Sequence, residues 1–117
     1  MRVSRGAPGP EAPSLRIGSA RVDVPSREVR GRDGAGPVRR LTPKALRVLL
    51  ELAARPGQVV GREELLARVW PDTLPTDDVL TQAVTQLRKV YGAIVGPEPF
   101  IQTIAKSGYR LLVPVEW

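Results

Sequence analysis

The spacing of apolar residues changes twice along this chain of 117 residues, and the two changes constrain the fold more than any other feature of the sequence. Apolar and polar residues alternate over 15–41, the pattern of strands with one face in water. From 43 to 91 the apolar residues recur at helical spacing, and alternation returns over 99–114. Strands, three helices and a hairpin in this order predict an α+β fold in a single domain.

Strand signals fill residues 15–41. The segments LRIG and ARVDV alternate around the turn residues GS, which predicts two strands. REVRG and a segment ending near Leu41 flank the turn cluster DGAG and predict two more. We therefore expect a short antiparallel four-stranded sheet. Residues 1–14 are basic and rich in Pro and Gly, and we expect them to form a flexible lead-in.

The first two helices have ends that the sequence marks clearly. Thr42 is a favourable N-cap and Pro43 suits the first helical turn, so a helix is expected over 43–55. A second, shorter helix is expected in GREELLARVWP, and Pro71 ends it. Gly61 stands where Ser or Thr would complete a capping box, which weakens the start of the second helix.

The third helix is expected over about 77–91, with Thr76 or Asp77 as its cap and Gly92 closing it. Placed at about 100° per residue, its apolar side holds Leu80, Ala83, Val84, Leu87 and Tyr91. Its polar side holds Asp78, Thr81, Gln82, Thr85, Gln86 and Lys89, with Arg88 on the flank. The helix is therefore amphipathic, and its outward face consists mainly of amides, hydroxyls and cations.

No Asp or Glu occurs between Asp78 and Glu98, and this absence has two readings. A solvated surface helix can simply lack acids. Alternatively the helix lies in the DNA major groove, where Gln and Thr meet base edges and Lys and Arg meet phosphates. The context favours DNA, because a short helix, a turn and a second amphipathic helix match a helix-turn-helix. The hairpin that follows carries Lys106 and Arg110 about its tip, although charge also blunts ordinary sheet edges.

Composition argues against several other functions. The chain has no His and no Cys, so we expect no enzyme, no metal site and no cofactor. No apolar run approaches the roughly 18 residues of a membrane span, and a cytoplasmic location is expected. A net charge of +6 suggests an anionic partner. Residues 1–40 alone carry nine Arg against four acids, however, so a solvated basic tail explains much of the excess.

Three segments in order resemble the winged-helix DNA-binding (effector) domain of OmpR/PhoB-type transcription regulators: LTPKALRVLLELAARPGQVVGREELLARVWPD, LTQAVTQLRKVYG and FIQTIAKSGYRL. The resemblance covers about 41–112. It implies a winged helix-turn-helix over 15–114, with a four-stranded N-terminal sheet (15–41), three helices (42–92) and a hairpin wing (99–114). The implied function is that of a sequence-specific, double-stranded DNA-binding transcription regulator with its third helix in the major groove.

The resemblance also implies roles for particular residues. At base edges we expect Gln82, Thr85 and Gln86. At phosphates we expect Thr81, Arg88 and Lys89, and on the wing Lys106, Ser107 and Arg110. The loop between the second and third helices can contact RNA polymerase in this family, and here it includes Asp72, Thr73, Leu74 and Asp77. Many relatives carry Arg at the positions of Thr85 or Gln86, so their base preference does not transfer.

The short lead-in after Met1 cannot hold a receiver domain, so the arrangement is similar to that of CadC/ToxR-type regulators, in which the DNA-binding domain comes first. In that branch a membrane helix and a sensor domain can follow, in a longer parent protein. A dimer or tandem pair on DNA is expected because one domain offers a small interface. The alternative hypothesis is a winged-helix protein-interaction module that does not read DNA, favoured by Asp78 and the mildly acidic middle of the chain. A membrane-surface helix is disfavoured because large apolar anchors are few.

Overall fold

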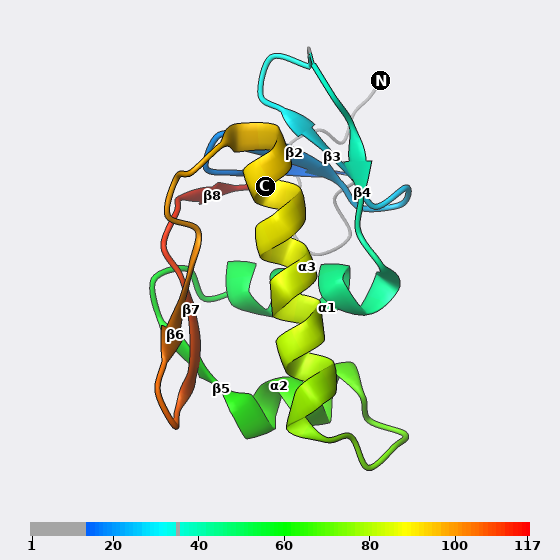
Figure 1. The fold of residues 1–117 in the computed structure, drawn as a ribbon, viewed down its shortest axis with the longest axis vertical. Helices are drawn as coiled ribbons and strands as arrows, with labels where there is room; N and C mark the ends of the chain where they lie inside the picture. The colour runs from blue at the N-terminus through cyan, green and yellow to red at the C-terminus, as the bar shows by residue number, and fades with distance from the viewer. Residues whose placement is uncertain (1–13, 35) are drawn as a thin grey trace, which may run out of the picture.

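Two antiparallel sheets and three helices build the structure, a computed structural model that describes residues 14–34 and 36–117 (Figure 1). The helix α3 runs through the middle of the molecule, with one sheet at its C-terminal end and the other along its side. This arrangement confirms the predicted α+β winged helix-turn-helix. The predicted lead-in lies outside the described residues except for Ser14, which begins a strand.

The N-terminal sheet contains the four predicted strands and one that the sequence did not reveal. The strands are β1 (Ser14–Ile17), β2 (Ala20–Asp23), β3 (Glu28–Gly31), β4 (Arg39–Arg40) and β8 (Val115–Glu116), in the order β4-β3-β2-β1-β8. The fifth strand, β8, pairs with β1 through Arg16↔Glu116 and Ile17↔Val115. The prediction of four strands was therefore one short.

The first two helices follow the sequence prediction closely. The helix α1 spans Pro43–Ala53, and the Thr42 hydroxyl accepts a hydrogen bond from the Ala45 backbone N–H (3.2 Å), as expected of an N-cap. The helix α2 spans Arg62–Val69, and Gly61 provides no side-chain cap. The first N–H of α2, that of Arg62, donates to the carbonyl of Ser107, which lies in the turn of the predicted C-terminal hairpin (2.9 Å).

Two cations of α1 satisfy the other end of α2. Lys44 Nζ donates to the Val69 carbonyl (2.8 Å), and a guanidinium nitrogen of Arg47 donates to the Arg68 carbonyl (3.0 Å). The last carbonyls of a helix lack intrahelical partners and carry partial negative charge, so positive donors stabilise them. These bonds fix α1 and α2 against each other.

The helix α3 spans Asp77–Val95 and is longer than predicted. Gly92 does not close it, because packing of Ile94 and Val95 against the core continues the helix for another turn, and Gly96, with a φ of 102°, ends it. Thr76 is the N-cap residue, but its side chain makes no capping hydrogen bond. The predicted apolar side is confirmed, since all five of its residues are buried.

The second sheet is the wing, which we define as β5 (Val59–Gly61), β6 (Ile101–Ile104) and β7 (Gly108–Leu111), in the order β5-β7-β6. The predicted hairpin corresponds to β6 and β7. The strand β5 was not predicted, because it has only three residues and ends in Gly. The close approach of β5 to β7 requires Gly108, because a Cβ there would overlap the Val60 carbonyl.

One core joins both sheets to the helices. Its fully buried side chains are mostly Leu and Val, among them Leu15, Leu41, Leu49, Leu52, Leu65, Leu80, Leu87 and Leu111. The Tyr91 ring of α3 stacks on Phe100, with ring centroids 3.9 Å apart. Its hydroxyl accepts a hydrogen bond from the Ser19 N–H in the β1–β2 turn (3.3 Å). The aromatic pair therefore connects α3, the N-terminal sheet and the chain that enters the wing.

Candidate nucleic-acid interface

The polar side of α3 is the most distinctive surface of the molecule. Its residues are mostly exposed. In Figure 1 the helix α3 lies between the wing on one side and the strand β4 on the other. Thr81, Gln82, Thr85 and Lys89 are exposed there, and none makes a hydrogen bond or ion pair with another residue that the structure describes. Their donors and acceptors are free for a ligand, and no carboxylate of α3 beyond Asp78 opposes a phosphate.

Gln86 differs from its neighbours because its side chain is already used within the fold. It is half-buried, and its Oε1 accepts hydrogen bonds from both the Thr42 backbone N–H (2.9 Å) and the Thr42 hydroxyl (3.3 Å). A bidentate contact to adenine needs the amide oxygen as well as the amide nitrogen. Gln86 therefore holds α3 to the start of α1, and only its NH₂ group is left for a base.

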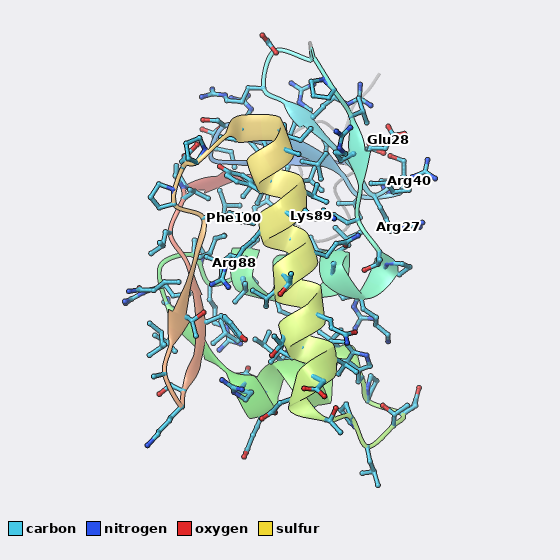
Figure 2. All side chains as sticks on the ribbon, in the orientation of Figure 1. Arg27, Glu28, Arg40, Arg88, Lys89 and Phe100 are labelled. Atoms are coloured by element: carbon cyan, nitrogen blue, oxygen red, sulfur yellow. The ribbon has the colours of Figure 1, made fainter. Side chains whose placement is uncertain are left out.

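Arg88 connects α3 to the wing. One of its guanidinium nitrogens donates to the Ile101 carbonyl (2.9 Å) and to the Thr103 hydroxyl (2.9 Å), both in β6. In Figure 2 the side chain lies on the wing side of α3, whereas Lys89 lies on the outward face. Arg88 thus tethers the helix to the wing, and its side chain remains exposed beside the outward face of α3.

The three predicted wing residues lie at or near the hairpin tip. Lys106 is exposed and has a φ of 63°, a left-handed conformation that is uncommon outside Gly, Asn and Asp. Ser107 is exposed, and its N–H closes the turn by donating to the Ile104 carbonyl (2.9 Å). Arg110 lies further along β7, where its Nε and one terminal nitrogen donate to Gln102 Oε1 (3.0 and 2.7 Å). Lys106 is thus the most available cation of the wing.

The loop between α2 and α3 lies at the opposite end of α3 from the N-terminal sheet (Figure 1). Asp72, Thr73 and Leu74 are exposed, and Leu74 is 99% exposed. Asp77 is instead the first residue of α3, where its carboxylate lies 3.4 Å from a guanidinium nitrogen of Arg62. The structure thus separates the four residues into three at an outward loop and one at a helix junction.

A shallow depression beside Gln82 was not evident from the sequence. It lies between the start of α1, the end of α2 and α3, and its lining residues are Thr42, Lys44, Trp70, Val79, Gln82, Ala83 and Gln86. Lys44 Nζ is 5.7 Å from the centre of the Trp70 ring. No sequence pattern indicates this site, because Lys44 and Trp70 are far apart in the chain and each suits its own amphipathic helix.

The titratable groups with shifted pKa values lie away from the polar side of α3. Hydrogen bonds from Ser26 hold the pKa of Asp23 below its ordinary value, and a hydrogen bond from Arg55 does the same for the pKa of Glu64. Burial raises the pKa of Tyr91. Within 14–34 and 36–117, no polar or charged side chain is buried and no group of three potential metal ligands occurs. The part of the chain that the structure describes also has no helix long and apolar enough to cross a membrane.

Comparison with known proteins identifies a family. Residues 36–111 match the family model described as "Transcriptional regulatory protein, C terminal". The chain is 36% identical over 110 residues to the transcriptional activator CadC of Escherichia coli, an alignment that covers 92% of this chain and 20% of CadC. It is 41% identical over 75 residues to the transcriptional regulatory protein AfsQ1 of Streptomyces coelicolor, covering 63% of this chain and 33% of AfsQ1. The chain thus spans a fifth to a third of these relatives.

Solved structures agree with the fold. The DNA-binding domain of Escherichia coli CadC superposes with a TM-score of 0.80 at 32% identity, covering 91% of this chain and 97% of that one. The DNA-binding domain of Klebsiella pneumoniae RstA, solved in complex with the RstA box, superposes with a TM-score of 0.66 at 25% identity, covering 86% and 98%.

Proposed function

Because the chain belongs to the family of C-terminal domains of transcriptional regulatory proteins, we propose that it is a sequence-specific, double-stranded DNA-binding domain that regulates transcription. The observation that supports this most strongly is the outward side of α3. Four side chains suited to bases and phosphates are exposed there without a partner among the described residues, and no acid follows Asp78 in the helix.

Base recognition would rest on fewer residues than the sequence predicts. Gln82 and Thr85 are free to meet base edges in the major groove, each good contact contributing about 1–3 kcal/mol of discrimination. Gln86 would contribute through its NH₂ group alone, because Thr42 occupies its oxygen. Its main role in our proposal is to orient α3.

Affinity would come largely from phosphate contacts. Thr81 and Lys89 border the outward face of α3, and Arg88 keeps free N–H groups while it holds the wing. Lys106 and Ser107 at the wing tip would reach the backbone or the minor groove, with Arg110 behind them. Each phosphate neutralised by a cation releases counterions, so binding would weaken steeply with salt.

Other partners are part of the same proposal. The exposed loop with Asp72, Thr73 and Leu74 is a candidate surface for RNA polymerase, with Asp77 at its edge. A dimer or tandem pair on DNA would enlarge the small interface of one domain. We propose a cytoplasmic position, where the DNA target would lie, and no enzymatic role, since the chain has neither His nor Cys. A membrane attachment would need a segment of a longer parent protein.

The direct test is selection of bound duplexes from a random-sequence pool, followed by fluorescence anisotropy on the selected duplex over a range of salt concentrations. We expect wild type to enrich a defined sequence and Gln82→Ala/Thr85→Ala to lose that preference. Gln58→Ala, an exposed glutamine in the loop between α1 and β5, is the matched control and should bind like wild type. Equal enrichment by all three proteins would contradict base reading by α3. Absence of DNA binding at low salt would favour the alternative, a protein-interaction module.

A further inference from the structure

The side of α3 opposite the wing is bordered by a basic strand. The helix α3 packs against β3 and β4 there, and the Thr42–Gln86 hydrogen bonds join it to the residues that follow β4 (Figure 1). A helix in the major groove lies between two phosphate backbones, one on each side of it. The wing can reach only one of these backbones. Any contact with the second backbone must therefore come from residues on the side of α3 opposite the wing.

The two residues of β4 lie on opposite faces of the N-terminal sheet. Arg40 stands in register with Glu28, and a guanidinium nitrogen of Arg40 lies 3.5 Å from the Glu28 carboxylate. Arg39 stands in register with Val29, which is buried in the core beneath α3. Because directly opposed residues share a face and successive residues alternate, Arg39 lies on the α3 side of the sheet and Arg40 on the outer side.

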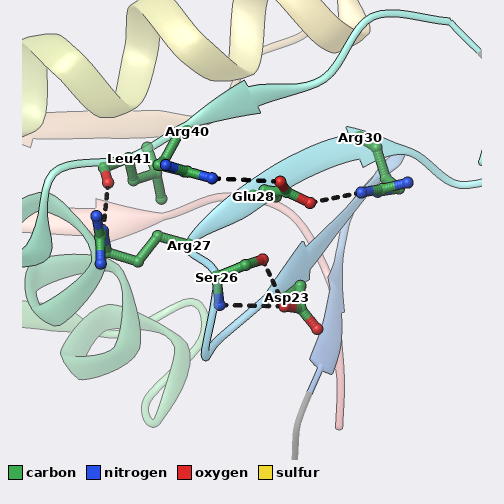
Figure 3. A network of polar contacts seen from close by, with 7 residues as sticks. All are labelled: Asp23, Ser26, Arg27, Glu28, Arg30, Arg40 and Leu41. Atoms are coloured by element: carbon green, nitrogen blue, oxygen red, sulfur yellow. Dashed lines mark hydrogen bonds and ion pairs between the residues drawn. The ribbon is translucent and has the colours of Figure 1, made fainter.

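Hydrogen bonds and ion pairs hold β4 in a fixed position (Figure 3). Arg27 and Leu41 exchange two bonds: the Leu41 N–H donates to the Arg27 carbonyl (2.9 Å), and Arg27 Nε donates to the Leu41 carbonyl (2.9 Å). Glu28 pairs with Arg30 (2.7 Å) as well as with Arg40. A strand of only two residues is thereby held through Arg40 and through Leu41, the residue that follows it, and this places Arg39 at a defined point on the sheet edge.

Arg39 has no acidic partner among the residues that the structure describes. Its side chain is exposed, and its only hydrogen bond to a described residue is a long one to the carbonyl of its neighbour Val38 (3.5 Å). On the same side of the molecule α3 presents Lys89 and no carboxylate beyond Asp78. A cation held at an edge without a carboxylate partner is available to an anion.

We propose that Arg39 binds a DNA phosphate on the side of the groove opposite the wing, so that the domain contacts both backbones that flank α3. This inference rests on the proposed DNA-binding function and adds a specific contact to it. Arg40, one residue away but on the outer face, takes no part in the contact.

The test compares Arg39→Gln with Arg40→Gln in the full chain, so that the basic N-terminal residues are the same in all proteins. The probe is a mixed-sequence duplex of roughly three helical turns, followed by anisotropy at several salt concentrations. For Arg39→Gln we expect several-fold weaker binding. The negative slope of log Kobs against log salt should become shallower by about 0.9, because one phosphate contact is lost. Arg40→Gln removes the same charge and should leave the slope unchanged. Thermal melting of both variants verifies folding.

Ethylation interference locates the contact. We expect one phosphate on the backbone away from the wing to lose its interference in Arg39→Gln and to keep it in Arg40→Gln. If both variants bind like wild type, or if both weaken equally, the assignment to Arg39 is overturned, since the effect is then absent or due to general charge. If Gln82→Ala/Thr85→Ala alters sequence preference while Arg39→Gln changes nothing, only this inference fails. If wild type does not bind DNA, the proposed function fails with it.

Discussion

Gln86 lies on the predicted DNA-binding face of α3, but its side chain makes hydrogen bonds within the fold. Its amide oxygen accepts two hydrogen bonds from Thr42, which lies 44 residues away in the sequence. Such a contact follows from tertiary packing, so no local pattern announces it. Gln82, one helical turn earlier, has the same chemistry and no such partner within the described residues.

We predict opposite effects for the two glutamines. Gln86→Ala should lower the free energy of unfolding by about 1 kcal/mol, the usual contribution of such hydrogen bonds, and leave base preference largely intact. Gln82→Ala should leave stability unchanged and reduce discrimination at one base pair by about 1–3 kcal/mol. Urea denaturation and competition between single-base variants of the selected duplex measure the two quantities. A loss of base preference in Gln86→Ala as large as that in Gln82→Ala would show that Thr42 releases the amide on DNA.

Lys106 combines a charge with an uncommon backbone conformation, and substitutions can separate the two. Asn tolerates the left-handed region, so Lys106→Asn should keep the free energy of unfolding within about 0.5 kcal/mol of wild type. Lys106→Val should cost about 1–2 kcal/mol because a β-branched residue is strained there. Both should reduce the salt slope of DNA binding by about 0.9. A normal slope in Lys106→Asn would show that the wing tip does not touch phosphate.

For single residues, the sequence predicted which side chains are exposed better than it predicted which of them are free of hydrogen bonds within the fold. Helical spacing alone placed Thr81, Gln82, Thr85 and Lys89 outward, and the structure agrees. It could not show that Arg88 is bonded to β6 or that Arg110 is bonded to Gln102, because each bond depends on where a distant segment packs.

At the scale of the elements, two glycines with different surroundings have different consequences. A Cβ at Gly108 would overlap the Val60 carbonyl, so Gly108→Ala should push β5 from β7 and cost about 1–3 kcal/mol, as overpacking does. Gly92 lies within α3, and a Cβ there would meet no atom of another described segment within 4 Å, so Gly92→Ala should stabilise the protein by about 1 kcal/mol. Thermal and urea denaturation compare the pair. Equal effects of the two substitutions would be incompatible with this packing of the wing.

The elements were predictable where they were long and had marked ends. Thr42 and Pro43 predicted the start of α1 correctly, and alternation predicted β1, β2 and β3 of the N-terminal sheet. The strands β5 and β8 were missed because each has only two or three residues and depends on pairing with a strand that is distant in the sequence. Gly92 was read as a helix end because helix propensity is a local quantity, whereas burial of the following turn is not.

For the whole molecule, Tyr91 joins the N-terminal sheet to the wing, and its titration should report on that junction. Burial, and to a lesser extent the Glu98 carboxylate, raise the pKa of Tyr91, so the native state holds the proton more tightly than the unfolded chain. The stability from this group is complete below the ordinary tyrosine pKa of about 10 and is lost as pH rises through the higher native value. Unfolding free energy should therefore fall more steeply above about pH 10 in wild type than in Tyr91→Phe. If the plots of unfolding free energy against pH were parallel for the two proteins, burial would not raise the pKa of the Tyr91 hydroxyl.

The hydrogen bond between the Arg62 N–H and the Ser107 carbonyl limits where related domains can gain or lose residues. Hairpin tips are ordinarily the places where chains tolerate insertions and deletions. Here a carbonyl in the tip accepts a hydrogen bond from the first N–H of α2, a helix whose N-cap, Gly61, has no side chain to bind the N–H groups that follow. A residue added or removed at the tip would move this carbonyl and deprive the Arg62 N–H of its partner. The length of the wing is thus tied to the helix-turn-helix, and we expect related domains to change loop length elsewhere, for example between α2 and α3, before they change it at this tip.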